Sequence, residues 1–188
     1  MMASVGGSKY FLILPMPGRL HVSLREAQQR ILSQRWDLVH SICEPNFLVV
    51  ATFDVSDENL PLFKIALRSV LSSFFEARRG SGLYCSFRGM LLFEESMIYA
   101  RLNGGIEDIN ALRDCLTAAC GSSMRSDGRL YLPHVRLFGP TLPSTESVSS
   151  IITDHESMFL GSGVIHQVHL RGSGEITDLG GVVSVYTM

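Results

Sequence analysis

The chain has 188 residues, of which 46% are hydrophobic and 18% charged, and its net charge at pH 7 is -2. This length suffices for one large domain, or for one domain built of two small lobes, whose hydrophobic core needs neither metals nor disulfides. The near-neutral charge excludes broad, nonspecific adhesion to nucleic acid, because that mode of binding needs many cationic contacts to phosphates. A single focused phosphate pocket is compatible with it.

Cysteine usage and hydropathy indicate the compartment. The four cysteines, Cys43, Cys85, Cys115 and Cys120, show no C-x-x-C spacing, and we expect them to be packing residues. The start of the chain has no basic segment followed by a long apolar run. The longest apolar runs are strand-sized, far short of the roughly 18 residues of a membrane span. We therefore expect a soluble intracellular protein that does not bind membranes. Its compartment is expected to be the cytoplasm or the nucleus, and an organelle is also compatible with these features.

Strand-like and helix-like segments alternate in the first half of the chain. Residues 9–14 predict a strand. Ser23 and Glu26 have the spacing of a capping box, which predicts a helix over residues 23–34. Residues 46–55 are rich in Val and Phe without a helical period, so we expect a buried strand there.

The longest predicted helix covers residues 60–77. Two arginines and Gly80 follow it, as expected at a helix end. Trp36, Phe74 and Phe75 are expected in the core rather than as platforms for base stacking. The apolar residues that recur at helical spacing, and that we expect on the buried face, are Leu62, Ile65, Ala66, Val70, Leu71 and Phe74.

The second half repeats this order. Its predicted elements are strands at 83–93 and 97–102, a helix at 107–119, a strand at 130–139, a weak helix ending near 155, and strands at 163–171 and 181–186. Strand-helix-strand order in both halves predicts an α+β fold in which two small lobes pack around a shared groove. We expect residues 1–188 to form a single domain of this kind.

The strand predicted at 130–139 carries the most informative polar pair, His134 and Arg136. Residues two apart on a strand share a face, so this imidazole and this guanidinium can meet one phosphate together. The alternative interpretation is a strand with two solvated polar residues.

A family resemblance strengthens the functional interpretation. The order of segments, together with Pro133-His134, residues 97–102 and the ending from 169–171 through 180–186, resembles the 2H phosphoesterase superfamily. Within it, the chain is most similar to the 2′-5′ RNA ligase-like branch that includes the A-kinase-anchoring-protein central domain. In that family each of two lobes contributes one His-x-Thr/Ser-x motif to a central groove. The two histidines act as general base and general acid on 2′-5′ or cyclic phosphodiesters, and the hydroxyls hold the phosphate.

The chain departs from both motifs. His134 stands at the histidine position of the second motif, but Arg136 occupies its Thr/Ser position. The first motif is expected in residues 46–55, which contain no histidine. The preferred register starts at Val50 and keeps the hydroxyl in Thr52, and registers starting two or four residues earlier fare no better.

Loss of one motif histidine weakens catalysis. One histidine cannot both remove and deliver a proton within a single step, and losing one partner typically removes about 10²–10⁴-fold of rate. We therefore predict a catalytically impaired 2H-like module that binds RNA ends or a nucleotide phosphate, or that binds a protein partner within a larger assembly. His134 is the candidate catalytic residue, and Thr52, Arg136 and Ser173 are the candidate phosphate-binding residues.

Several alternatives remain open at this stage. Arg136 offers donors suited to phosphate oxygens, but an ion pair with Glu175 or Asp178 would account for it equally well. Ser173 matches a hydroxyl that approaches the substrate in the family, or else it is a turn residue. One alternative to the impaired module is an active RNA or cyclic-nucleotide phosphodiesterase that uses His134 and a second catalytic group such as His40. Another alternative is a purely structural subunit.

No metal site and no cofactor are expected. His166 and His169 lie three apart in a strand-like segment, so they point to opposite faces and cannot easily share one ion.

Overall fold

The computed structural model describes residues 7–93, 97–125, 131–140, 142, 145–172 and 182–187. Its elements are, in order, β1 (Ser8–Pro15), α1 (Gly18–Gln34), the 3-10 helix η1 (Trp36–Ser41), β2 (Phe47–Val55), α2 (Leu60–Glu76), β3 (Leu83–Phe93), β4 (Met97–Gly104), α3 (Ile106–Cys120), β5 (His134–Phe138), α4 (Thr145–Asp154), β6 (Phe159–Ile165), β7 (Gln167–Gly172) and β8 (Val182–Thr187). The strands form two four-stranded antiparallel sheets. We call the sheet ordered β2-β1-β7-β8 the first sheet and the sheet ordered β5-β4-β3-β6 the second sheet.

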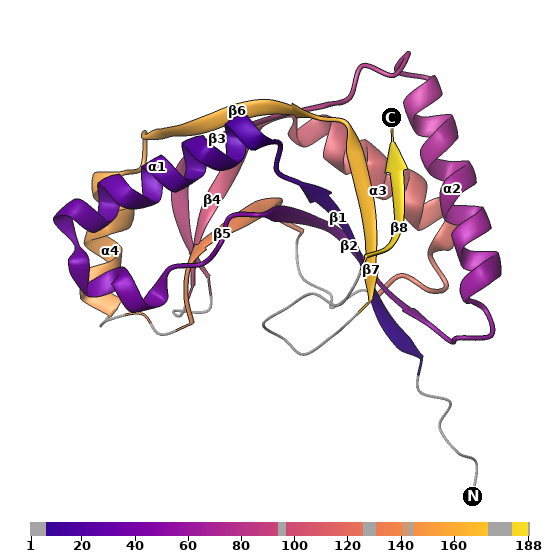
Figure 1. Cartoon of the computed structure of the whole chain (residues 1–188), viewed down its shortest axis with the longest axis horizontal. Helices are drawn as coiled ribbons and strands as arrows, with labels where there is room; N and C mark the ends of the chain where they lie inside the picture. Colours follow the sequence, from indigo (N-terminus) through magenta and orange to yellow (C-terminus); the bar gives the residue numbers. More distant parts are fainter. Residues whose placement is uncertain are drawn as a thin grey trace, which may run out of the picture.

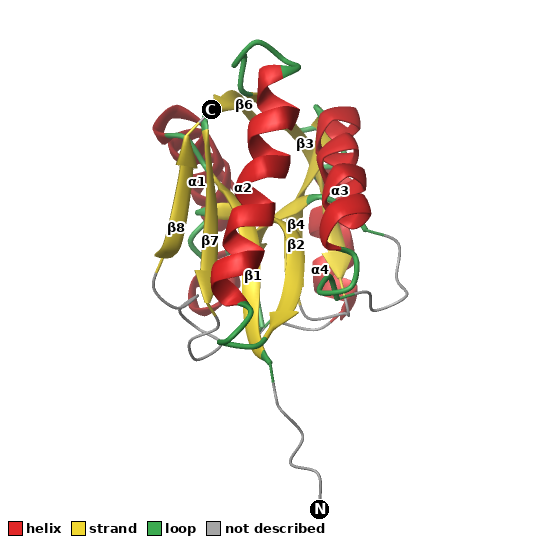
Figure 2. Cartoon of the chain, turned by 90° about the vertical axis from the view of Figure 1, so that its right-hand side faces the viewer, coloured by secondary structure: helices red, strands yellow, loops and turns green. Residues whose placement is uncertain are grey.

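The helices lie at opposite ends of the molecule with the strands between them (Figure 1). At one end, α1 contacts β6 and α4 contacts β3, both in the second sheet. At the other end, α2 and α3 pack against each other, and α3 contacts β2. Figure 2 shows these two helices side by side in front of the strands. The α+β, two-lobed fold predicted from the sequence is confirmed.

One hydrophobic cluster runs through both sheets. Phe53 of β2, Phe87 of β3 and Phe138 of β5 are among its largest fully buried side chains. An aromatic side chain buries about 150–250 Å², so such residues dominate the energetics of a small core. The two lobes are therefore joined by a continuous core.

The start of α1 differs from the prediction. The helix begins at Gly18, and its N-cap is Pro17, whose φ of -65° and extended ψ of 151° lead directly into the first turn. Ser23 lies inside the helix, so the capping-box prediction was wrong. Proline at a helix start costs little because it has no N–H to satisfy there.

α2 buries a face shifted from the predicted one. Leu62 and Ile65 are 69% and 67% exposed, so their placement in the core was wrong. Leu71 and Phe74 were placed correctly. The full buried set on α2 is Phe63, Leu67, Leu71, Phe74 and Phe75. Both sets repeat at helical spacing, so periodicity alone could not select the buried one.

Three further expectations need correction. Trp36 is 79% exposed at the start of η1, a 3-10 helix that the sequence analysis did not predict. Cys115 is exposed on α3 rather than packed. The strand predicted at 163–171 is two strands, β6 and β7, separated at His166.

None of the helices in the described part of the chain has the length and hydropathy needed to cross a membrane.

Candidate functional site

One face of the first sheet collects polar side chains. Phe11 of β1 pairs with both Thr52 and Arg171, and Ile13 pairs with both Val49 and His169. Directly opposed residues of antiparallel strands project to the same face. We call this set, formed by Phe11, Ile13, Val49, Thr52, His169 and Arg171, the Thr52 face. The intervening Leu12 and its partners Ala51 and Leu170 belong to the hydrophobic core.

The pairing between β1 and β2 also locates the residues of the expected first motif. The register shifts between Leu12 and Ile13, which leaves Val50 as an extra residue on β2. Val50 is fully buried in the core cluster, whereas Thr52 is partly exposed on the opposite face. In the preferred register of the first motif, Val50 and Thr52 therefore project to opposite faces of the sheet. Val49 shares the face of Thr52, and it is not a histidine either.

His134 and Arg136 share a face of the second sheet. On β4, Arg101 pairs with His134 and Tyr99 pairs with Arg136. These four residues form what we call the His134 face. The alternation inferred from the sequence thus holds for this strand.

Aromatic rings surround the imidazole of His134. Its ring centroid lies 4.0 Å from that of Tyr99 and 6.3 Å from that of Phe93. Nδ1 lies 2.5 Å from the carbonyl oxygen of Leu132. With Nδ1–H donating to this carbonyl, the neutral ring carries its acceptor lone pair on Nε2.

Burial lowers the pKa of His134, and the charge of Arg136 lowers it further, while the hydrogen bond to Leu132 acts in the opposite direction. The ring is therefore neutral at pH 7. A neutral imidazole can accept a proton or a hydrogen bond through Nε2, but it brings no positive charge to a phosphate.

We expect the ring of His134 to titrate below its ordinary pKa of 6.5, with the midpoint moving upward in Arg136→Ala. The unfolded chain binds this proton more readily, so acidification below pH 6.5 lowers the free energy of unfolding. The contribution of the neutral ring is intact above that pH. NMR titration of the His134 Hε1 signal tests this, with Arg30→Ala on α1 as control. A wild-type midpoint at or above 6.5 would contradict the assignment.

Arg136 is exposed, and it makes no ion pair with any carboxylate in the described residues. Burial raises the pKa of the Cys43 thiol, and the nearby guanidinium of Arg136 opposes this rise. The guanidinium therefore lies close to Cys43. The other candidate residue, Ser173, and the proposed carboxylate partners Glu175 and Asp178 lie outside the described residues.

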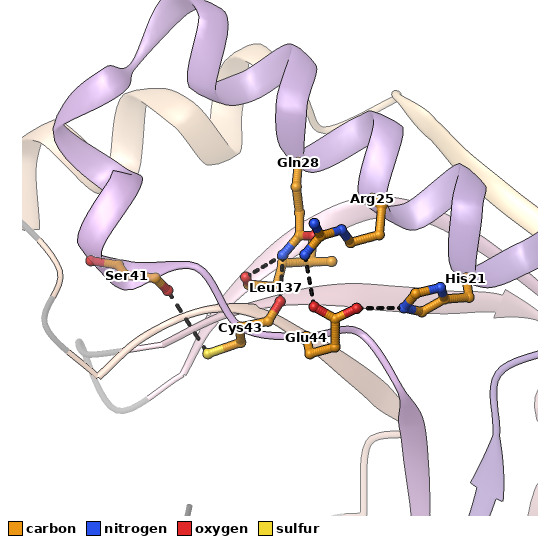
Figure 3. Close-up of polar contacts among 7 residues, drawn as sticks. All are labelled: His21, Arg25, Gln28, Ser41, Cys43, Glu44 and Leu137. Carbon is orange, nitrogen blue, oxygen red and sulfur yellow. Dashed lines mark hydrogen bonds and ion pairs between the residues drawn. The ribbon is translucent and has the colours of Figure 1, made fainter.

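The segment that contains Cys43 is fastened to both α1 and β5. Nε2 of Gln28 donates to the carbonyl oxygens of Cys43 at 2.7 Å and of Leu137 at 2.6 Å (Figure 3). Glu44 accepts hydrogen bonds from His21 at 2.8 Å and from Arg25 at 2.7 Å. These contacts fix the entry into β2 beside the strand that carries Arg136.

Two residues that the sequence analysis did not single out hold β2 against the second lobe. The Tyr131 hydroxyl donates to the carbonyl of Val49 at 2.8 Å, and Nη1 of Arg113 donates to that of Val50 at 2.6 Å. The Arg113 guanidinium stacks 3.7 Å above the Tyr131 ring. Tyr131 lies in the segment that leads directly into His134, so this network places the strand of Thr52 beside the strand of His134.

Thr52 itself has a free hydroxyl in the described part of the chain. Its backbone carbonyl accepts the N–H of Arg125 at 2.8 Å, which is part of the pairing of β2 with residues 123–125. The side chain is partly exposed on the Thr52 face and forms no hydrogen bond with a described residue. It remains available to an added ligand.

His169 and Arg171 add polar groups to the Thr52 face. Burial lowers the pKa of His169, and the charge of Arg171 lowers it further. Nδ1 of His169 and Nε of Arg171 are buried without a hydrogen-bond partner among the described residues. An unsatisfied buried polar atom typically costs about 1–3 kcal/mol, so such atoms favour an incoming partner. The sequence pattern pointed to residues 169–171 as part of the family resemblance and to His169 as a weak metal candidate, but it did not place His169 beside Thr52, because that position depends on the pairing of β1 with β7.

Within the described residues, no group of three or more His, Cys, Asp or Glu side chains converges in a way that could hold a metal ion. His40, considered as a second catalytic group, is exposed on η1, and no contact joins it to His134 in the described structure.

Solved structures share this fold across almost the whole chain. Escherichia coli LigT complexed with 3′-AMP is 14% identical, with a TM-score of 0.62 over 97% of this chain and 98% of that one. The protein TT0787 of Thermus thermophilus is 15% identical, with a TM-score of 0.67 over 95% and 97%. The MHV ns2 PDE domain is 9% identical, with a TM-score of 0.56 over 89% and 99%.

No family model and no curated protein matches the sequence of the chain. Because the solved structures share so little sequence identity with the chain, their similarity establishes the fold and not the activity. The chain therefore has the two-lobed fold of the 2H phosphoesterases, as the resemblance in its sequence implied.

Proposed function

We propose that this protein is a phosphoesterase-like module that binds RNA ends or nucleotide phosphates and has lost two-histidine catalysis. The observation that carries this proposal is the asymmetry between the motif strands. β5 keeps His134, whereas the Thr52-face positions of β2 are Val49 and Thr52. The structures of LigT with 3′-AMP and with phosphate support a phosphate ligand for this fold.

Several donors support ground-state binding. Arg136 is an exposed guanidinium without a carboxylate partner in the described residues, and a guanidinium can bind two phosphate oxygens at once. Arg171 has an unsatisfied Nε, and Thr52 has a free hydroxyl in the described part of the chain. Replacement of the motif hydroxyl by Arg136 exchanges a neutral donor for a charged one, which favours retention of the ligand.

The two motif strands, β2 and β5, do not supply both of the acid–base groups that catalysis needs. Hydrolysis of a phosphodiester needs a base at the attacking oxygen and an acid at the leaving oxygen. Neutral His134 is suited to the role of base. Neither Val49 nor Val50 can supply the acid.

One observation favours the alternative of an active phosphodiesterase. His169 places a second imidazole on the Thr52 face, although on β7 rather than β2. Its lowered pKa leaves it neutral at pH 7, so it too is poised as a base rather than as an acid. Turnover that depends on both His134 and His169 would establish this alternative.

The test measures binding and turnover together. Purified protein is titrated with 3′-AMP and incubated with 2′,3′-cyclic AMP and with a 2′-5′-linked oligoadenylate. We expect binding of 3′-AMP without turnover of either diester. Arg136→Ala should weaken binding by about 10–100-fold, which corresponds to the loss of a hydrogen bond to a charged group.

Matched variants separate the outcomes. Arg30→Ala, an exposed arginine on α1, should leave binding unchanged. Turnover that disappears in His134→Ala and His169→Ala would refute the loss of catalysis. Absence of both binding and turnover would refute the phosphate module and leave a structural subunit.

A further inference from the structure

A second hollow lies between α2 and β8. It consists of two adjoining cavities of about 590 Å³ and 400 Å³, which share Arg68 and Tyr186. The larger cavity reaches the end of α2 at Arg79, and the smaller one reaches Lys64 near its start. Of the candidate phosphate-binding residues that the structure describes, neither Thr52 nor Arg136 lines either cavity.

β8 offers an open strand edge at this hollow. It is the terminal strand of the first sheet, and it pairs with β7 alone among the described strands. Its residues, Val182–Thr187, include no charged side chain and no proline. Natural sheets usually protect an exposed edge with charges, proline or a covering segment, because an open edge invites another strand.

Exposed apolar side chains lie on the α2 wall of this hollow. Ile65 of α2 lines the smaller cavity and is 67% exposed. Val185 of β8 borders the larger cavity, but it pairs with His169, so its side chain projects to the Thr52 face. Leu62, one helical turn before Ile65, is 69% exposed. These residues of α2 belong to the apolar set that the fold leaves outside the core, so they remain unpartnered in the described chain.

The charge of the hollow is positive. Lys64, Arg68 and Arg79 line it together with a single carboxylate, Glu76. None of the three cations forms an ion pair with a described residue. Arg79 also adopts a left-handed backbone conformation, with φ of 55°, which is uncommon for a residue other than glycine.

We propose that this hollow binds an extended, acidic segment of a partner protein, which adds to β8 as a further strand beneath α2. Backbone hydrogen bonds to β8 would supply affinity, and alternate side chains of the segment would meet α2 and supply specificity. Acidic side chains match Lys64, Arg68 and Arg79, and an apolar one matches Ile65. This site is separate from Thr52 and Arg136 and gives the chain a means to join a larger assembly.

A protein segment fits this hollow better than single-stranded RNA does. Recognition of RNA without sequence preference relies on aromatic faces against which bases stack. The two rings that line the hollow, Phe75 and Tyr186, are only 6% and 8% exposed. They are packed into the core and present no open ring face.

The experiment uses the full chain and a capped peptide of sequence Glu-Thr-Val-Thr-Glu-Thr-Val-Thr-Glu. In a strand this sequence puts its glutamates and valines on one face. NMR titration should shift the amide signals of β8 and of the exposed side of α2. Combined Arg68→Glu and Arg79→Glu should weaken binding at least about tenfold, and the exposed Arg30→Glu on α1 should not.

N-methylated peptides test strand addition directly. Backbone N–H groups alternate in direction along a strand, so only one of two alternate sets can face β8. Methylation of the threonine nitrogens in one peptide, and of the glutamate and valine nitrogens in another, should abolish binding in one case only. Equal binding of both peptides would overturn strand addition.

Three further results would overturn the proposal. The first is the absence of shifts in β8 and α2 at millimolar peptide. The second is equal binding of a peptide with lysine in place of glutamate. The third is oligouridylate shifting the same amides when the acidic peptide does not. None of these results depends on 3′-AMP binding, so failure here is distinguishable from failure of the proposed function.

Discussion

Replacement of Tyr131 by alanine is expected to lower the free energy of unfolding by about 3 kcal/mol. The substitution removes a partly buried ring that packs against the core, the stacking of Arg113 on that ring, and the hydrogen bond to the Val49 carbonyl. Burial of the phenol also raises the pKa of Tyr131, consistent with a hydroxyl held away from water. Urea unfolding followed by far-ultraviolet circular dichroism measures the effect, because the exposed Trp36 is a poor fluorescent reporter of the core.

Tyr131→Phe separates the hydroxyl from the ring. It keeps the stacking surface but leaves the Val49 carbonyl without its donor, so we expect a loss of about 1–3 kcal/mol. A double-mutant cycle with Arg113→Ala should show coupling, since both residues hold neighbouring carbonyls of β2. Additive effects, or a tyrosine-to-alanine variant as stable as the wild type, would contradict the role of this network.

Gly105→Ala is expected to destabilise the fold by about 3 kcal/mol. Gly105 is the N-cap of α3 and has φ of 84°, where an L side chain is strained. An added Cβ would lie 1.8 Å from the carbonyl oxygen of Tyr84, so the backbone would have to move. Because α3 carries Arg113, this movement would also disturb the contact to β2.

Gly18→Ala provides the matched control. Gly18 is the first residue of α1, and an added Cβ there meets no atom within 4 Å. Alanine at a compatible helical position typically stabilises by about 0.4–1 kcal/mol. Equal stability of the two variants in urea unfolding would show that the backbone at Gly105 tolerates a side chain.

The order of strands and helices was predictable because the hydrophobic periodicity of a segment and the residues that end it, such as glycine and proline, are local properties of the sequence. The strand at 83–93 matches β3, and the pattern of both halves led to the correct α+β class. Which face a helix buries is not local. Leu62 and Ile65 have the same spacing as the residues that α2 buries, and only the sheet beneath the helix selects between the two faces.

The candidate site shows the same division. Alternation along one strand sufficed to place His134 and Arg136 on one face, because no bulge separates them. It failed for β2, where the extra residue Val50 reverses the alternation beside Thr52. The position of His169 beside Ile13 depends on the pairing of β1 with β7, which no local pattern encodes.

The first sheet is completed only after β7 has been synthesised. Tyr10 of β1 pairs with Gly172 of β7, so β1 has only β2 as a neighbouring strand until β7 is made. Proteins dominated by contacts between residues distant in the sequence fold slowly, in about milliseconds to seconds, because the entropy of loop closure is lost before strand pairing contributes favourable free energy. A nascent chain that ends before β7 therefore exposes the unpaired side of β1, an edge to which a strand of another chain can add.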